Sequence, residues 1–197
     1  MVTWSRNVED IAKALTAMSA TKNDGKPLSI ASAFAFWTEW TIKIRKEKRT
    51  VFLIGNGASA SMASHVAADL AKNAHVRTEV FTDLALITAI ANDLSFNDIF
   101  SEPLKRRLAH GDMLVAISSS GQSPNILQAA RTTRECGGIV VTLSAMKHDN
   151  PLFTLGDLNF YIPGHTYGMA ETCHAALLHY WIDKIVSENN LHPEATL

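Results

Sequence analysis

The sequence has 197 residues, enough for one domain with a sizeable hydrophobic core. Hydrophobic residues make up 47% of it and charged residues 19%, and the net charge is -1, all ordinary values for a globular protein. This balance gives no basic field for nucleic acid or an anionic membrane, and no apolar run approaches the ~20 residues of a membrane span. Cys136 and Cys173 form no C-x-x-C pair, and the chain opens without a basic segment followed by an apolar core, so we expect a cytoplasmic protein.

Two helices are predicted before the first strand. Apolar residues at helical spacing mark residues 4–20, a polar break covers residues 21–27, and a longer helix fits residues 29–48. These helices carry five large aromatic side chains: Trp4, Phe34, Phe36, Trp37 and Trp40. Such residues are typical of subunit contacts, which predicts an obligate oligomer, although they could instead pack on the chain's own sheet.

Strands and helices alternate through the remainder of the chain. Strands are predicted at residues 50–54, 79–82, 113–117, 139–143 and 158–162. Helices are predicted after the loop at 55–61 and at residues 84–92, 99–108, 124–135 and 167–188. The spacing is that of βαβ units, so we expect an α/β domain with a mostly parallel sheet.

The segment from Met113 to Ser123 carries the clearest functional signal. Five apolar residues suit a strand buried on both faces, and Pro124 then begins a helix. The loop between them carries four hydroxyls, on Ser118, Ser119, Ser120 and Ser123. Free amides and the positive end of the helix dipole favour an anion there, phosphate above all. The alternative is that Ser123 only caps the helix, but four hydroxyls in six positions exceed what a cap needs.

A second small-residue loop, Gly55 to Ser61, joins the first strand to its helix. It lacks the Gly-Lys-Ser/Thr of a Walker motif, and Ala60 fills the third glycine position of a dinucleotide fingerprint. Ligands of parallel sheets bind beyond the carboxyl ends of the strands, so this glycine loop and the serine loop are expected to face one site.

Two pairs of polar residues could hold a metal. His65 and Asp69 are four residues apart and share one helical face, and Glu171 and His179 are eight residues apart on the last helix. Together they would offer the nitrogen and oxygen ligands of Zn²⁺, with Fe²⁺, Ni²⁺ and Mn²⁺ as alternatives. Spacing alone favours surface carboxylates and packed histidines. We expect no chemistry from three more residues: a buried Cys173, an exposed His165 and a packed His174.

The two small-residue loops together resemble the sugar isomerase (SIS) domain. The similarity covers about residues 29–189 and implies a single domain over residues 1–197, with residues 1–28 as an N-terminal helical extension. Residues 91–100, Ala-Asn-Asp-Leu-Ser-Phe-Asn-Asp-Ile-Phe, resemble the phosphoheptose isomerases in particular, which interconvert sedoheptulose 7-phosphate and a D-glycero-D-manno-heptose 7-phosphate. The resemblance implies a flavodoxin-like three-layer sandwich with a five-stranded parallel sheet, preceded by the two helices. It also implies a homotetramer with active sites at subunit interfaces.

The resemblance further implies roles for particular residues. The phosphate would be held by Ser118, Ser119, Ser120 and Ser123, and the sugar would meet Asn56, Ser59, Asp93 and Glu171. One divalent metal per subunit, with Zn²⁺ expected, would be surrounded by His65, Asp69, Glu171 and His179. Family members usually have His, Glu, Gln and His at these positions, so this chain departs at Asp69 and Glu171. Asp69 is the first choice for the base, with His179 as its acid–base partner and Glu171 as an alternative base.

Aldose–ketose isomerisation is the reaction that these residue types imply. It moves a proton between C1 and C2 through an enediol, and a metal can polarise the carbonyl or hold the enediolate oxygens. Two alternatives stay open: a non-catalytic SIS-domain regulator, like the bacterial protein that associates with the replication initiator, and an isomerase of another sugar phosphate. The polar residues at 65 and 179 favour an enzyme, since a binding module need not keep them. The expected partners are the sugar phosphate and further copies of the chain, without nucleic acid or membrane.

Overall fold

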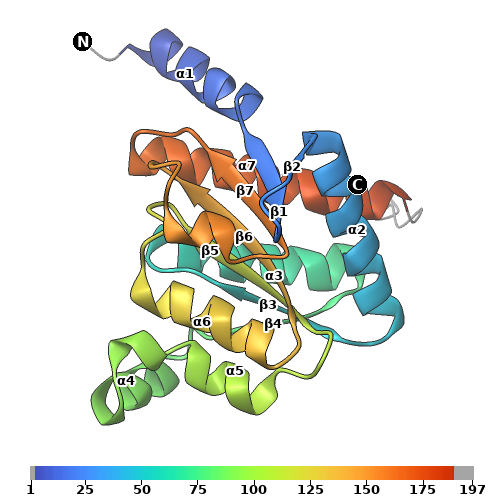
Figure 1. Ribbon diagram of the computed structural model, residues 1–197, viewed down its shortest axis with the longest axis vertical. Coiled ribbons are helices and arrows are strands. Elements are labelled where there is room, and N and C mark those ends of the chain that lie inside the picture. The colour runs from blue at the N-terminus through green and yellow to red at the C-terminus, as the bar shows by residue number, and fades with distance from the viewer. Residues whose placement is uncertain (1–2, 189–197) are drawn as a thin grey trace, which may run out of the picture.

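A seven-stranded sheet forms the centre of the protein. The computed structural model describes residues 3–188, and its strands are β1 (Ser19–Lys22), β2 (Pro27–Leu28), β3 (Thr50–Ile54), β4 (Arg77–Val80), β5 (Met113–Ser118), β6 (Ile139–Ala145) and β7 (Leu158–Ile162). They lie in the order β2-β1-β7-β6-β5-β3-β4 (Figure 1). The five strands from β7 to β4 are parallel, and β1 and β2 add an antiparallel hairpin at the β7 edge.

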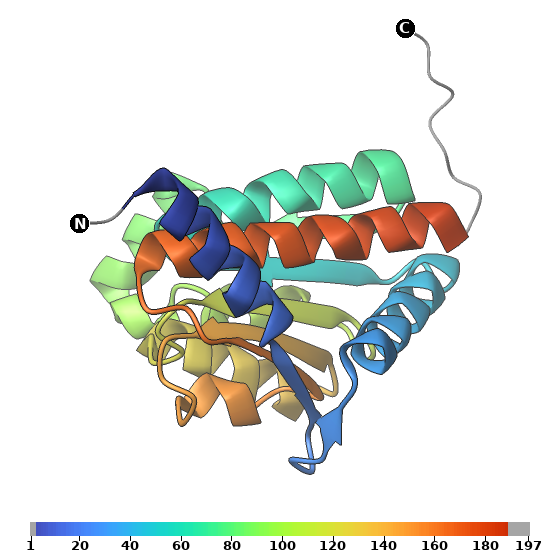
Figure 2. The ribbon, with the colours of Figure 1, turned by 90° about the horizontal axis from the view of Figure 1, so that it is seen from above.

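Helices cover both faces of this sheet. They are α1 (Trp4–Thr16), α2 (Ile30–Lys46), α3 (Ala58–Ala74), α4 (Leu84–Asp93), α5 (Ser101–Arg107), α6 (Pro124–Glu135) and α7 (Tyr167–Glu188), with 3-10 turns η1 (Phe96–Asp98) and η2 (Pro151–Thr154). Buried residues of α2, α3 and α7 share one hydrophobic cluster with the sheet, and those of α5 and α6 share a second. Figure 2 shows α3 and α7 side by side over one face of the sheet, where they are in contact.

The parallel part of the sheet confirms the expected flavodoxin-like fold. Numbered along the chain, its five strands lie in the order 2-1-3-4-5, which is the order of that fold. Every residue of β5 and β7 is buried, as strands covered on both faces require. The bounds of β3, β7, α6 and α7 are those that the sequence predicts. The predicted helix at 99–108 is found as the shorter α5, and the 3-10 turn η1 precedes the predicted start.

The N-terminal region departs from the prediction of two helices alone. The hairpin of β1 and β2 lies between α1 and α2, so the sheet has seven strands, not five, and residues 1–28 are not a purely helical extension. Asn23 and Asp24 form the turn, which the Gly25 amide closes by donating to the Lys22 carbonyl at 2.9 Å, and the φ of +75° at Gly25 suits glycine. Ala20 of β1 is buried against β7, so the hairpin covers an edge that would otherwise be open. The predicted end of the core at residue 189 lies outside the described residues.

Two of the five N-terminal aromatic residues belong to the chain's own core. Phe34 and Trp37 are 3% and 0% exposed, and Trp37 stacks on Trp181 of α7 with ring centroids 3.9 Å apart. The prediction of subunit contacts is therefore wrong for these two, and packing on the chain's own sheet is right. Trp4 of α1, by contrast, is 79% exposed, so its role in subunit contact stays a prediction.

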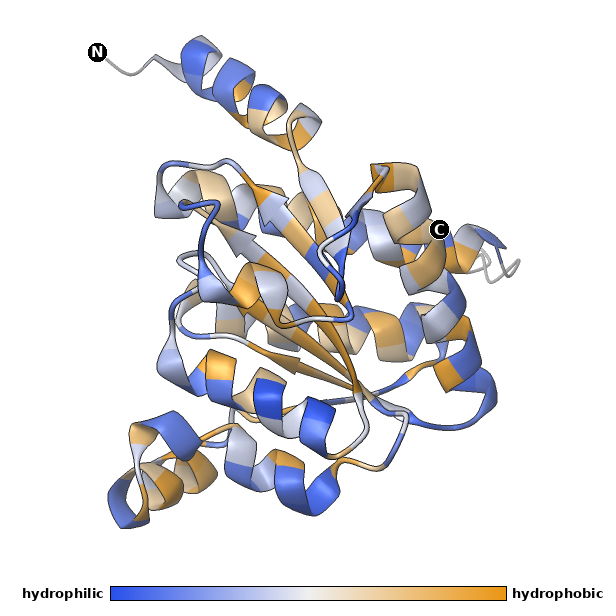
Figure 3. Cartoon of the chain, in the orientation of Figure 1, coloured by the Kyte–Doolittle hydropathy of each residue, from blue (hydrophilic) through white to orange (hydrophobic). Residues whose placement is uncertain are grey.

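The α4 helix is apolar but has little cover. None of its residues is buried, and Leu84 at its start is 73% exposed. Figure 3 shows hydrophobic residues along much of this helix. Leu94 and Phe96, which follow it, are 59% and 57% exposed. Exposed apolar surface of this kind is typical of an interaction site. No helix within residues 3–188 is long and apolar enough to cross a bilayer.

Candidate active site

The carboxyl ends of β3 and β5 open into a small cavity of about 160 Å³, the serine pocket. The glycine loop follows β3 and the serine loop follows β5, so the two loops face one site as the parallel sheet predicts. The start of α7 supplies a further wall. The lining residues are Asn56, Ser59, Ile117, Ser118, Ser119, Ser120, Ser123, Tyr167 and Glu171.

Glycine is required at the sharpest point of each loop. A Cβ atom at Gly55 would lie 2.6 Å from the backbone carbonyl carbon of Ser59, which is too close for any other residue. Gly121 has a φ of +63°, and a Cβ atom there would collide with the Asn150 side chain. The chain can therefore pass from strand to helix within a few residues, which brings the serine hydroxyls to the N-terminus of α6.

The hydroxyls of the serine loop are not used up by helix capping. Ser123 occupies the N-cap position of α6, but its side chain accepts no hydrogen bond from the first helical turn. Its Oγ atom lies 3.3 Å from the Oγ atom of Ser118 instead. The expectation that Ser123 caps the helix through its side chain is therefore wrong. A group of hydroxyls beside a helix N-terminus is well suited to a phosphate.

The serine pocket has little positive charge of its own. Among residues 3–188 no lysine or arginine lines it, and the charged side chain in its wall is Glu171. Attraction for a phosphate must come from hydroxyls, backbone amides and the α6 dipole. The Glu171 carboxylate opposes that attraction unless a cation or a proton offsets its charge.

Three of the four predicted metal ligands meet between α3 and α7. His65 and Asp69 of α3 and His179 of α7, here called the polar trio, each offer a donor atom, and these atoms all lie within 4.8 Å of one another. His65 Nε2 is 3.3 Å from Asp69 Oδ2, and the two imidazole centroids are 5.4 Å apart. Both histidines are exposed and Asp69 is partly buried. Two imidazole nitrogens and one carboxylate oxygen are a donor set that fits Zn²⁺ with a coordination position left open.

Glu171, the fourth predicted ligand, is not part of the polar trio. It lies eight residues before His179 on α7, roughly 12 Å along the axis at 1.5 Å per residue. Its place is in the serine pocket, where a contact with the sugar was predicted. The convergence of all four residues on one ion is therefore not found within a single chain.

Asp93 is the predicted sugar contact that the structure leaves outside the pocket. It is the last residue of α4, is exposed, and accepts a hydrogen bond from Asn92 Nδ2 at 2.9 Å. The α4 helix packs beside η1 and is not part of the pocket wall. Within one chain, Asp93 does not join Asn56 and Ser59.

The three residues from which no chemistry was expected lie as predicted. Cys173 and His174 are both 0% exposed, while His165 is exposed. Burial raises the pKa of the Cys173 thiol, so the nucleophilic thiolate is disfavoured. Burial also lowers the pKa of His174 to about 4, so this imidazole is neutral at physiological pH.

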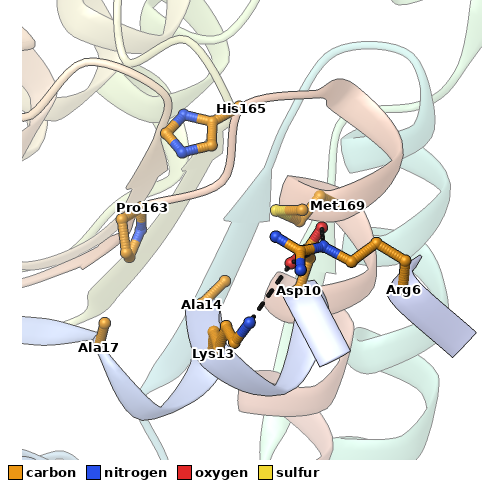
Figure 4. Close-up of a pocket in the computed structure, with 8 residues that line it drawn as sticks. All are labelled: Arg6, Asp10, Lys13, Ala14, Ala17, Pro163, His165 and Met169. Atoms are coloured by element: carbon orange, nitrogen blue, oxygen red, sulfur yellow. Dashed lines mark hydrogen bonds and ion pairs between the residues drawn. The ribbon is translucent and has the colours of Figure 1, made fainter. Parts of the chain in front are cut away.

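A larger cavity of about 380 Å³ lies between α1 and the start of α7 (Figure 4). Its lining residues are Arg6, Asp10, Lys13, Ala14, Ala17, Pro163, His165 and Met169. Its two permanently basic groups are already paired with carboxylates, because Arg6 lies 3.1 Å from Asp10 and 4.0 Å from Glu9, and Lys13 lies 3.9 Å from Asp10. The serine pocket, with its cluster of hydroxyls at a helix N-terminus, is the better phosphate site.

Comparison with known proteins decides the family. The SIS domain family matches residues 38–145, more than half of the chain. A phosphoheptose isomerase from Bradyrhizobium sp. (strain ORS 278) is 30% identical over 190 residues, with 85% of this chain and 92% of that protein covered. The chain belongs to the phosphoheptose isomerase family of SIS-domain proteins. A phosphoheptose isomerase from Coxiella burnetii is 34% identical over 140 residues, with 66% and 70% of the two chains covered.

Solved structures agree with this family in fold. The phosphoheptose isomerase from Neisseria gonorrhoeae superimposes with a TM-score of 0.78 at 23% identity, over 93% of this chain and 95% of that one. The enzyme from Francisella tularensis gives a TM-score of 0.79 at 21% identity, over 94% of each chain.

Two residues that line the serine pocket, Ile117 and Tyr167, were not predicted as site residues from the sequence. Ile117 is the last apolar residue of β5, and Tyr167, 63% exposed, is the first residue of α7. A signal for Tyr167 exists in hindsight, because a helix after a parallel strand begins at the carboxyl edge of the sheet, where ligands bind. Its phenol group can donate a hydrogen bond to a substrate oxygen.

Proposed function

We propose that this protein is an aldose–ketose isomerase that interconverts sedoheptulose 7-phosphate and D-glycero-D-manno-heptose 7-phosphate. The observation that carries the proposal is a serine pocket for phosphate in the same fold as a trio of two imidazoles and one carboxylate. A phosphate anchor and an acid–base cluster are the two parts that this reaction needs. The name of the relatives, phosphoheptose isomerase, supplies the substrate class.

The phosphate end of the substrate binds in the serine pocket. The hydroxyls of Ser118, Ser119, Ser120 and Ser123 donate to its oxygens, and the α6 N-terminus adds the favourable end of its dipole. Asn56 and Ser59, on the glycine-loop side of the pocket, are placed to bind the sugar hydroxyls next to the phosphate. With the phosphate anchored in this way, C1 and C2 of the sugar are held in a fixed position relative to the acid–base residues.

The polar trio moves the proton. Asp69 is the base that takes the proton from carbon, and the imidazole of His65 beside its carboxylate orients it. His179 exchanges a proton with the neighbouring substrate oxygen as the enediol forms and collapses. Glu171 is the alternative base, because a carboxylate stands there where the family usually has an amide.

His65, Asp69 and His179 would hold one divalent ion, with Zn²⁺ preferred by two nitrogen ligands and one oxygen ligand. When bound, this ion supplies a Lewis acid for the carbonyl and the enediolate oxygens. Glu171 would be its fourth protein ligand. Its distance from His179 along α7 requires that it come from a second copy of the chain.

Geometry favours a site shared between two copies. Ala175 lies midway between Glu171 and His179, so two α7 helices that cross antiparallel about a two-fold axis near Ala175 would place Glu171 of one copy beside His179 of the other. Gly168, Thr172 and Ala176 on α7 are small and exposed, which permits close contact of the two helices. The serine pocket of one copy then lies beside the polar trio of its partner.

The exposed apolar residues of α1 and α4 supply further contact surface, so we propose a homotetramer with active sites at subunit interfaces. Trp4 and Leu84 are among the most exposed large hydrophobic residues, and Leu94 and Phe96 extend the α4 surface. Asp93 lies on this surface, directly before Leu94, and would contact the sugar held by a neighbouring subunit.

The alternatives are a non-catalytic sugar-phosphate regulator and an isomerase of another sugar phosphate. A regulator needs the serine pocket, but it does not need the polar trio. Incubation with sedoheptulose 7-phosphate in D₂O tests the proposed reaction, because isomerisation puts a deuteron on the carbon that receives the proton, and NMR detects it. We expect exchange and aldose formation, loss of both in EDTA, and recovery with Zn²⁺. Phosphate binding without exchange would refute the proposed reaction, and the same assay with other sugar phosphates would then separate an isomerase of another substrate, which exchanges one of them, from a regulator, which exchanges none.

The same assay assigns the base. Asp69→Asn should lose turnover, whereas Glu171→Gln, which restores the amide usual in the family, should keep it. An active Asp69→Asn variant together with an inactive Glu171→Gln variant would move the base to Glu171. His165→Gln is the matched control, because His165 is exposed and lies outside both the serine pocket and the polar trio.

A further inference from the structure

A hydrogen-bonded asparagine pair, with one buried and one exposed member, joins the two loops of the serine pocket. Asn125, the second residue of α6, is 1% exposed, while Asn56 is exposed in the pocket wall. Asn56 Nδ2 donates to Asn125 Oδ1 at 3.0 Å, and Asn125 Nδ2 donates to Asn56 Oδ1 at 2.9 Å. This reciprocal pair ties the glycine loop to the start of α6, although the residues are 69 positions apart in the sequence.

The direction of both hydrogen bonds is fixed by the backbone. The amide of Ile126 donates to Asn125 Oδ1 at 3.0 Å. A backbone N–H can only donate, so the Asn125 atom that it meets must be the carbonyl oxygen, and the other atom must be the NH₂ group. The NH₂ group of Asn125 in turn requires an oxygen opposite it, which sets the orientation of Asn56.

We propose that Asn125 is a positioning residue that holds the Asn56 amide in one orientation for the substrate. The pair uses one hydrogen of Asn56 Nδ2 and one lone pair of Oδ1, which leaves one donor and one acceptor on Asn56. The Asn side-chain amide torsion is broad and roughly two-fold, so without Asn125 the amide could present its donor and acceptor in either order. Asn125 does not line the pocket, so its effect on the ligand must pass through Asn56.

A double-mutant cycle tests this route. The variants are Asn56→Ala, Asn125→Ala and the double substitution, with KM and kcat for sedoheptulose 7-phosphate, the Kd of inorganic phosphate and the melting temperature measured for each. We expect Asn125→Ala to raise KM roughly two- to tenfold, because the substitution should cost the substrate about one neutral hydrogen bond to Asn56. In the Asn56→Ala background the same substitution should leave KM unchanged, because no amide remains to orient.

Two outcomes would overturn the proposal: KM effects that multiply in the double variant, or an Asn125→Ala variant with a lower melting temperature and the KM of the wild type. Asn159→Ala is the matched control, because Asn159 is also a buried asparagine, bonded to Thr142 and Gly156 and not part of the pocket wall. It should lower the melting temperature and leave KM unchanged.

A second variant keeps the test open if Asn125→Ala does not fold. Asn125→Asp retains an acceptor for the Ile126 amide but cannot donate to Asn56 Oδ1, and its added charge acts in both backgrounds and cancels in the cycle. The inference rests on the proposed function for the identity of the substrate. If the wild type does not turn over sedoheptulose 7-phosphate, the proposed function fails, while the Kd of sedoheptulose 7-phosphate as an unreacted ligand, measured for the same variants, still decides whether Asn125 acts through Asn56 on the sugar.

Discussion

Removing two hydroxyls from the serine pocket should weaken phosphate binding by a measurable and bounded amount. Ser119 and Ser123 both line the pocket, and each hydrogen bond to a charged group contributes about 1.5–3 kcal/mol. The double substitution to alanine should therefore cost about 3–6 kcal/mol, or roughly 10²- to 10⁴-fold in affinity at 1.4 kcal/mol per tenfold. The remaining hydroxyls, on Ser118 and Ser120, and the α6 amides can partly compensate, so the lower end is expected.

The assay is KM for sedoheptulose 7-phosphate together with the Kd of inorganic phosphate from calorimetry. Ser5→Ala with Ser187→Ala is the matched control, because both are exposed helical serines outside the pocket. A control with wild-type KM and a pocket variant with a large increase would support the assignment. Unchanged KM and Kd in a folded Ser119→Ala, Ser123→Ala variant would refute the reasoning from hydroxyls to phosphate.

Three further predictions follow from the described contacts. At low substrate concentration His65→Ala and the double serine variant should each have little activity alone, and a mixture of the two should recover activity if sites are shared between copies. No recovery, or a mass near 21.5 kDa in light scattering, would contradict sharing. Gly121→Ala should lower the free energy of unfolding by about 2 kcal/mol or more, because alanine is strained at positive φ and its Cβ meets Asn150; an unchanged urea midpoint would contradict this. As the pH falls from 6.5 to about 4, the His174 imidazole takes up a proton in the unfolded chain but stays neutral in the folded one, which lowers the free energy of unfolding by up to about 3 kcal/mol. His174→Leu should remove this pH dependence, measured by urea unfolding at several pH values, and His165→Gln should keep it.

Segments with strong local signals in the sequence could be predicted with their bounds. The bounds of β7 follow from a short apolar run, and those of α6 from a serine loop, a proline at the first helical position and the glycines after its end. The hairpin of β1 and β2 was missed because its strands have four and two residues. Its stability comes from pairing with β7, more than 130 residues later, and local propensity cannot report such a contact.

The candidate site likewise has parts that could be predicted from the sequence and parts that could not. The serine pocket could be predicted because its two loops lie at the ends of neighbouring strands, and the parallel sheet determines where those ends meet. The pairing of His65 with Asp69 follows from helical spacing. Spacing could not place Glu171. It lies on a helical face similar to that of His179, eight residues later, but about 12 Å from it along the α7 axis. Asp93 could not be placed either, because its position at the end of α4 depends on how α4 packs beside η1 and leaves it outside the pocket of its own chain.

Glu171 links the charge of the pocket to the assembly of the protein. A carboxylate about 5 Å from a phosphate oxygen costs about 3 kcal/mol per pair of unit charges at an effective dielectric constant near 20. The described pocket wall holds no lysine or arginine to offset this cost. In the proposed site shared between two copies, the polar trio of the partner would bring a divalent cation to the Glu171 carboxylate. The residue that would repel the substrate in an isolated chain would then be a metal ligand. The amide usual in the family has no such requirement, so phosphate affinity in this chain should depend on the metal more steeply than in its Glu171→Gln variant.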